Sequence, residues 1–176
     1  MEVSKTKEVV LLGILTAIVF VGQVIMGFLP NIEVVTLLFI VYTLVLGKKV
    51  FFIIYAFVIL EGFTYGIHTW WISYLYVWSL QALVTLLFRK QTSVFFWSIL
   101  SGFYGITFGA LCAIPYFISG GWAAGFGYWA SGIGFDITHC IGNVVVCLVL
   151  YKPLRFVLEW CTNEFLPKRR KINSQN

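Results

Sequence analysis

Charge is the scarcest property of this 176-residue chain, because charged residues make up 11% of it and soluble domains contain about a quarter. Only seven residues are acidic and two are histidines. Hydrophobic residues make up 60%, and the mean hydropathy is +0.93, which is more apolar than a soluble core can absorb. The net charge of +5 forms no patch suited to nucleic acid. We therefore expect one transmembrane domain spanning 1–176.

Several motifs are also missing. No G-x-x-x-x-G-K-[ST] run occurs, so any ATP-driven step needs a partner protein. The first apolar segment is too long for a cleavable signal peptide, and no A-x-A-like site follows it. The four cysteines fit no zinc spacing, and we expect them to be small buried apolar residues. We predict no cofactor, no metal site and no enzymatic activity.

The basic residues that are present alternate with pairs of apolar segments. Every second connection lacks Lys and Arg altogether, which predicts an even number of crossings with both termini in the cytoplasm. The positive run 168–171 would also be attracted to anionic lipid. The twelve basic residues are Lys5, Lys7, Lys48, Lys49, Arg89, Lys90, Lys152, Arg155, Lys168, Arg169, Arg170 and Lys171.

The apolar pattern predicts an all-α integral membrane bundle of six helices. Their expected ranges are 8–28, 33–46, 50–66, 70–88, 94–118 and 128–150, followed by a basic cytoplasmic tail. The second helix would be roughly 21 Å long, short of the ~30 Å hydrocarbon core. Irregular backbone at membrane depth persists only against protein or a wet cavity, so a site is expected nearby. The glycine-rich connection 119–127 is expected to be an outer loop that moves as a lid.

Polar side chains within the apolar segments gather toward the expected outer half. They are Asn31, Glu33, Glu61, His68, Gln81, Asp136, His139 and Asn143. The spacings of three, four and seven place 136, 139 and 143 on one helix face. Such groups are costly in a membrane and normally face the bundle interior, so the cluster predicts a pocket open to the outside.

Purely structural roles, without ligand binding, stay open for individual members of this cluster. Glu33 could only compensate the positive end of the second helix, and Glu61 could be an uncharged carboxyl. His68 could be an interfacial turn residue. Asp136 and His139 could be a hydrogen-bonded pair within one helix.

Aromatic residues crowd the same side of the chain. One group, 70–78, begins the fourth helix, and another, 116–129, surrounds the opposite outer connection. Some of them would form an interfacial belt, but their excess suits an apolar or heteroaromatic ligand. The predicted substrate-binding residues are Asn31, Glu33, Glu61, His68, Trp70, Trp71, Tyr74, Trp78, Trp122, Tyr128, Asp136, His139 and Asn143.

Three local patterns carry a resemblance that covers essentially the whole chain: Leu29-Pro30-Asn31-Ile32-Glu33, Gly13-xxx-Ala17, and the stretch from Leu60-Glu61-Gly62 to Trp78. With six helices in so short a chain, they resemble the substrate-binding S-components of energy-coupling factor (ECF) transporters. The resemblance implies capture of a vitamin from outside a bacterial plasma membrane. It also implies association through helix one with a transmembrane coupling subunit and two cytoplasmic ATPases.

On that resemblance Gly13 and Ala17 contact the coupling subunit, although the usual motif has alanine at both positions. The chain looks most similar to the cobalamin-specific lactobacillal type, and a cobalamin would bring His68 and His139 near its cobalt or its amide groups. Pantothenate, a pyrimidine or another flat heterocycle stays open. The absence of outward Lys and Arg argues against phosphorylated ligands and weakens pantothenate.

Two other classes remain as alternatives. A membrane enzyme would use Asp136-x-x-His139 with His68 and Glu61 as a metal site, but this set has no recognised spacing. A ligand-free membrane scaffold would have the polar cluster as satisfied packing alone.

Overall fold

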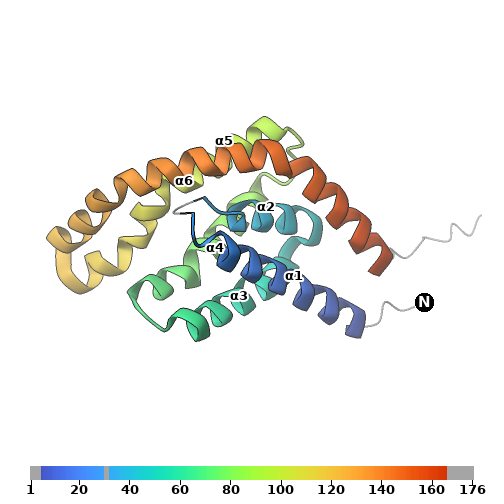
Figure 1. Cartoon of the computed structure of the whole chain (residues 1–176), viewed down its shortest axis with the longest axis horizontal. Coiled ribbons are helices and arrows are strands. Elements are labelled where there is room, and N and C mark those ends of the chain that lie inside the picture. The colour runs from blue at the N-terminus through green and yellow to red at the C-terminus, as the bar shows by residue number, and fades with distance from the viewer. Residues whose placement is uncertain (1–4, 30–31, 166–176) are drawn as a thin grey trace, which may run out of the picture.

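The structure is a computed structural model whose described residues are 5–29 and 32–165, and these residues form helices joined by short connections, with no strand (Figure 1). The elements are α1 (Lys5–Met26), α2 (Val35–Leu46), the short 3-10 helix η1 (Gly47–Lys49), α3 (Val50–Tyr65), α4 (Thr69–Leu87), α5 (Val94–Cys112) and α6 (Ile114–Phe165). The predicted all-helical class is confirmed for this part of the chain. Pro30, Asn31 and the run 168–171 lie outside the described residues.

The short helix α2 lies at the centre of the molecule. Every residue from Val35 to Thr43 is buried, and α2 contacts α1, α3, α4 and α6. A helix that is apolar all round gains most when other helices surround it. At 12 residues, α2 is about 18 Å long, so the irregular segment 32–34 continues its path through the bundle.

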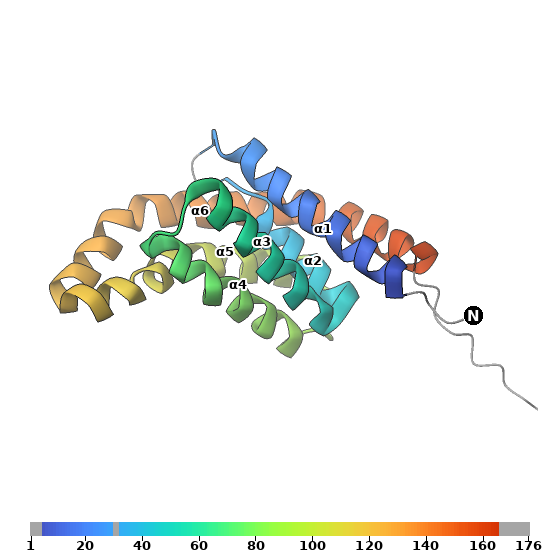
Figure 2. The same ribbon diagram turned by 90° about the horizontal axis from the view of Figure 1, so that it is seen from below.

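Helices α5 and α6 pack side by side and form the long edge of the molecule (Figures 1 and 2). The loop expected at 119–127 is wrong, because this segment is helical on both sides of a kink at Gly121. Gly121 has φ 71° and ψ −170°, a backbone conformation that only glycine adopts without strain. A Cβ at Gly125 would overlap the ring of Phe117, so this glycine permits close packing. The glycines therefore make a tight corner rather than the expected lid.

Helix α6 also continues past its expected end at 150, where a basic tail was predicted. Pro153 lies within the helix, and Arg155 Nε donates a 2.8 Å hydrogen bond to Glu159 Oε1 one turn later. Arg155 Nη1 also donates to the Tyr151 hydroxyl at 2.8 Å. The part of α6 after Gly121 is roughly 65 Å long, about twice the thickness of a hydrocarbon core. One end of α6 must therefore project beyond the core or run at a steep tilt.

The described basic turns gather toward one end of the molecule. Lys49 Nζ lies 2.8 Å from Glu8 Oε1, which joins η1 to the first turn of α1. The beginning of α1 and the end of α6 lie toward this same side in Figure 1. Five helical stretches are long and apolar enough to cross a membrane. Every helix except α2 exposes large apolar side chains, such as Phe63 and Phe95, and these features together indicate a membrane protein.

The kink gives a testable prediction. Gly121→Ala should destabilise the fold by about 1–3 kcal/mol, because a side chain is strained at this backbone conformation. Gly127→Ala is the matched control: its added Cβ meets nothing within 4 Å, and alanine favours a helix by up to about 1 kcal/mol. Thermal unfolding of the detergent-solubilised protein should show a lower Tm for the first variant alone. Equal Tm values for both variants would contradict the kink.

Candidate ligand-binding site

The first turn of α2 is the centre of a buried hydrogen-bond network. Glu33 Oε2 accepts a 2.8 Å bond from the Thr36 N–H and so satisfies one of the free donors at the start of α2. Gln81 Nε2 donates to the Thr36 carbonyl at 2.8 Å. Asn143 Nδ2 lies 3.3 Å from both Thr36 Oγ1 and the Ser101 carbonyl. This network fastens α2 to α4, α5 and α6.

Glu33 is also paired with His139 of α6. His139 Nε2 lies 3.1 Å from Glu33 Oε1, and their side chains are 5% and 12% exposed. Because an ionised carboxylate only accepts, Nε2 must carry the proton. Both oxygens of the Glu33 carboxyl therefore have donors, His139 Nε2 on Oε1 and the Thr36 N–H on Oε2. Glu33 therefore caps α2 and also holds His139.

This pair lies in the wall of a cavity of about 180 Å³, here named the Glu33 cavity. The cavity adjoins the last turns of α1, the end of that helix away from Lys5 and Lys7. Aromatic rings from α4 and α5 form the facing wall. The lining residues are Gln23, Met26, Gly27, Leu29, Ile32, Glu33, Tyr74, Trp78, Phe108 and His139.

The rings of the Glu33 cavity are held by other rings behind them. Tyr74 and Trp78 pack edge to face with their ring centroids 5.4 Å apart, and the centroid of Trp78 also lies 5.4 Å from that of the buried Phe39 of α2. Phe108 meets His139 edge to face at 5.0 Å. Preorganised ring faces and edges beside one hydrogen-bonded carboxylate–imidazole pair are suited to bind and orient a small ring compound.

A second cavity, here named the Asp136 cavity, lies between α5 and α6 and has a volume of about 330 Å³. Gly109 N–H donates a 3.0 Å bond to Asp136 Oδ1, whereas Oδ2 has no hydrogen-bond partner. Phe108 lines both cavities. The lining residues are Phe108, Gly109, Cys112, Tyr128, Ser131, Gly132, Phe135 and Asp136.

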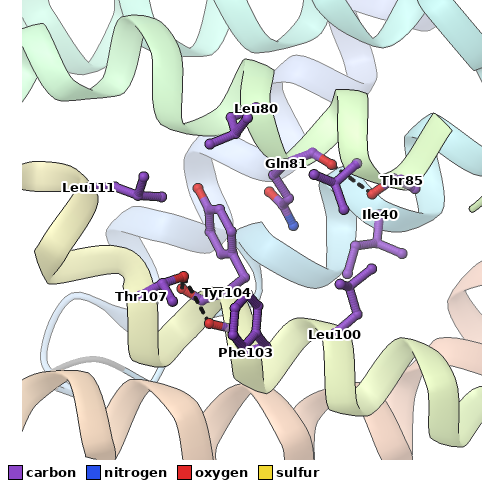
Figure 3. A pocket seen from close by; sticks show the side chains of 10 residues that line it. Ile40, Leu80, Gln81, Thr85, Leu100, Phe103, Tyr104, Thr107 and Leu111 are labelled. Atoms are coloured by element: carbon purple, nitrogen blue, oxygen red, sulfur yellow. Dashed lines mark hydrogen bonds between the residues drawn. The ribbon is translucent and has the colours of Figure 1, made fainter. Parts of the chain in front are cut away.

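A third cavity of about 260 Å³ lies between α4 and α5 and is lined mainly by apolar side chains (Figure 3). Tyr104 extends from α5 toward α4, and its hydroxyl has no partner. Gln81 lines the same cavity, but its Nε2 already binds Thr36. No carboxylate or imidazole lines this cavity, so it is suited to an apolar occupant.

The structure divides the predicted site residues among several places. Glu33, Tyr74, Trp78 and His139 line the Glu33 cavity, and Tyr128 and Asp136 line the Asp136 cavity. Asn143 belongs to the network around Thr36. The predicted pocket residues therefore fall into two neighbouring cavities and one hydrogen-bond network.

The remaining predicted residues lie outside these two cavities as defined above. Glu61 is buried in α3 with Oε1 unpaired, and Trp71 Nε1 donates to the Val58 carbonyl at 2.8 Å. Trp70 packs edge to face against Tyr74. His68 is the exposed residue before α4, and Trp122 is 76% exposed; Asn31 lies outside the described residues.

Sequence reasoning missed several lining residues. Phe108 is one of many aromatic residues in an apolar helix, and nothing local distinguishes it. Gly109 matters because a Cβ there would overlap the Asp136 carboxyl, which depends on how α5 and α6 pack. Gln23 carried a usable signal, since it is a polar residue near the outer end of an apolar segment. Among the residues in 5–29 and 32–165, no group of three or more His, Cys, Asp or Glu could hold a metal ion.

Thermal stability tests the Glu33–His139 pair. Glu33→Gln removes the charge from the side chain that accepts from both His139 and the Thr36 N–H, so its Tm should lie below that of wild type. Glu159→Gln, at a carboxylate that is 48% exposed, controls for the loss of one negative charge and should lower the Tm less. Equal Tm values for wild type and Glu33→Gln would contradict the pairing.

Comparisons with known proteins add no assignment to this geometry. No family model matches the chain, no curated protein matches it, and no solved structure matches it.

Proposed function

We propose that this chain is the substrate-binding S-component of an ECF-type ABC transporter, which captures a ring-bearing nutrient from outside the cell. The observation that carries the proposal is the Glu33 cavity. It places the buried Glu33–His139 pair opposite the rings of Tyr74, Trp78 and Phe108. Buried ionisable groups are costly inside a membrane protein and are functional candidates by default.

The proposed orientation has six crossings with both termini in the cytoplasm of a bacterial plasma membrane. The gathering of the described basic turns at one end of the molecule supports it, together with the Lys49–Glu8 contact. The Glu33 cavity adjoins the opposite end of α1 and would therefore open toward the outside.

The proposed substrate is a neutral or cationic ring compound. No Lys or Arg lines the Glu33 cavity or the Asp136 cavity, so a phosphorylated ligand would have no counter-ion there. Cobalamin, the best guess from the sequence, would need the cavity of about 180 Å³ to open widely. Its size favours the other candidate class, a small pyrimidine-type heterocycle.

The proposed partners are a transmembrane coupling subunit and two cytoplasmic ATPases, which supply the energy for uptake. Gly13 and Ala17 are both exposed on α1, and a Cβ at Gly13 would meet nothing within 4 Å. Their neighbours Ile14 and Ile18 are 46% and 48% exposed, so this face is free to dock. Small residues four apart allow another helix to approach closely.

A binding screen tests the proposed function. Purified protein should bind one member of a panel that contains cobalamins, pantothenate and pyrimidine compounds. Glu33→Gln and Tyr74→Ala should each weaken that binding about tenfold or more, which corresponds to about 1.4 kcal/mol. Trp122→Ala is the aromatic control, because Trp122 is 76% exposed and lines neither cavity as defined here. Wild-type affinity in both cavity variants would place the site elsewhere.

Helix docking gives a separate prediction. Gly13→Leu and Ala17→Leu should abolish uptake in the assembled transporter while purified protein keeps its ligand affinity, because both positions lie on the exposed face of α1. Gly134→Leu is the matched control, since its Cβ also meets nothing within 4 Å but it lies on α6. Normal uptake with both α1 variants would remove this face as the docking surface.

A further inference from the structure

The Asp136 carboxyl is incompletely satisfied within the described structure. Its residue is 5% exposed, Oδ1 accepts one bond from Gly109, and Oδ2 has no partner. An ionised carboxylate offers about four acceptor sites, and buried polar groups are normally hydrogen-bonded. Asp136 therefore keeps unused capacity for a donor.

No neighbour in the cavity supplies that donor as a cation. The lining contains no Lys, Arg or His. His139 lies one turn along α6, but its Nε2 is committed to Glu33 at 3.1 Å. The Ser131 hydroxyl donates to the Tyr128 carbonyl at 2.8 Å, so its proton is also in use. The carboxyl thus faces a cavity of about 330 Å³ whose lining contains no basic side chain.

The rest of the cavity wall is suited to a ring. Phe108 and Phe135 contribute apolar rings, and Tyr128 stacks on Tyr116 with a centroid distance of 4.1 Å and an angle of 15°. Aromatic faces attract cations as well as flat rings. The cavity therefore combines one acceptor with aromatic walls.

We propose that the Asp136 cavity is a second binding subsite that takes a cationic nitrogen group, of the amidinium or protonated amino-heterocycle class, carried on a ring. The two N–H groups of an amidinium match the two oxygens of a carboxylate. This inference rests on the proposed function in one respect, namely that cavities of this helix bundle bind ligands. It adds a charged specificity element that is separate from the Glu33 cavity.

Gly109 makes this arrangement possible. A Cβ at this position would overlap both carboxylate oxygens of Asp136, so only glycine lets α5 approach the carboxyl closely. The Gly109 N–H then holds Oδ1 at 3.0 Å and orients the side chain. The acceptor is therefore positioned before any ligand binds, which lowers the cost of ordering it.

Benzamidine and benzamide form a matched pair of probes, since they share a ring and differ mainly in charge. Calorimetry on the purified full chain should show benzamidine binding about tenfold or more tightly than benzamide, as expected for a charge-assisted pair. Asp136→Asn should remove that preference, because asparagine keeps the oxygen that accepts from Gly109 but loses the negative charge. Trp122→Ala, at an exposed residue that lines neither cavity, should leave it unchanged.

A pair of glycine variants tests the cavity without altering Asp136. Gly132 lines the cavity and Gly134 does not, and an added Cβ meets nothing within 4 Å at either position. Gly132→Leu should block benzamidine, whereas Gly134→Leu should bind it normally. This pair keeps the inference testable if Asp136→Asn fails to fold.

Equal affinity for the two probes would overturn the inference, and so would benzamidine binding that survives both Asp136→Asn and Gly132→Leu. Loss of the benzamidine preference in Trp122→Ala would show that the preference does not come from the Asp136 cavity and would overturn the inference equally. If the protein binds a vitamin through Glu33 but shows no preference for benzamidine over benzamide, the proposed function would be supported and the subsite contradicted. Benzamidine binding that depends on Asp136, with no vitamin bound, would support the subsite and contradict the proposed function.

Discussion

The contact on which the rest of the structure depends is the bond between Glu33 and His139. In an apolar interior an unsatisfied polar or charged group is far more costly than in water, and these two groups satisfy each other. Glu33 also accepts a hydrogen bond from the Thr36 N–H. The same side chain therefore holds the start of α2 beside His139 of α6. Because α2 is buried from Val35 to Thr43, the helices around it pack against an element that this contact positions.

The same constraint explains how two cavities with different chemistry lie side by side. In the Glu33 cavity both carboxylate oxygens already accept hydrogen bonds, so a ligand meets rings and a satisfied polar group. In the Asp136 cavity one carboxylate oxygen is left without a partner. Phe108 separates the two and lines both, while its edge-to-face contact with His139 keeps its ring in place. A ligand with an uncharged ring and a cationic group would match this pair of environments.

The polar face predicted on the sixth helix shows how far periodicity reaches. Spacings of three and four correctly put 136, 139 and 143 on one face, and all three are buried. They nevertheless have three different surroundings: a cavity beside Gly109, the bond to Glu33, and the Thr36 network. Helical spacing predicts only the side of the helix on which a residue lies. The group that it contacts depends on which neighbouring helix packs against that part of α6. The prediction of a loop at 119–127 was wrong for a related reason, since glycine permits both a loop and close helix packing.

The sequence by itself determined the all-helical class, the apolar exterior, the short second helix and the burial of most of the polar residues in the apolar segments, because these follow from composition and local periodicity. Only the tertiary structure decided that Glu33 meets His139 across 106 residues, that Phe108 divides two cavities, and that α6 continues to Phe165. Those outcomes depend on contacts between residues distant in the chain. The local sequence pattern predicts which residues are buried, whereas the packing of the helices determines which group each buried residue contacts.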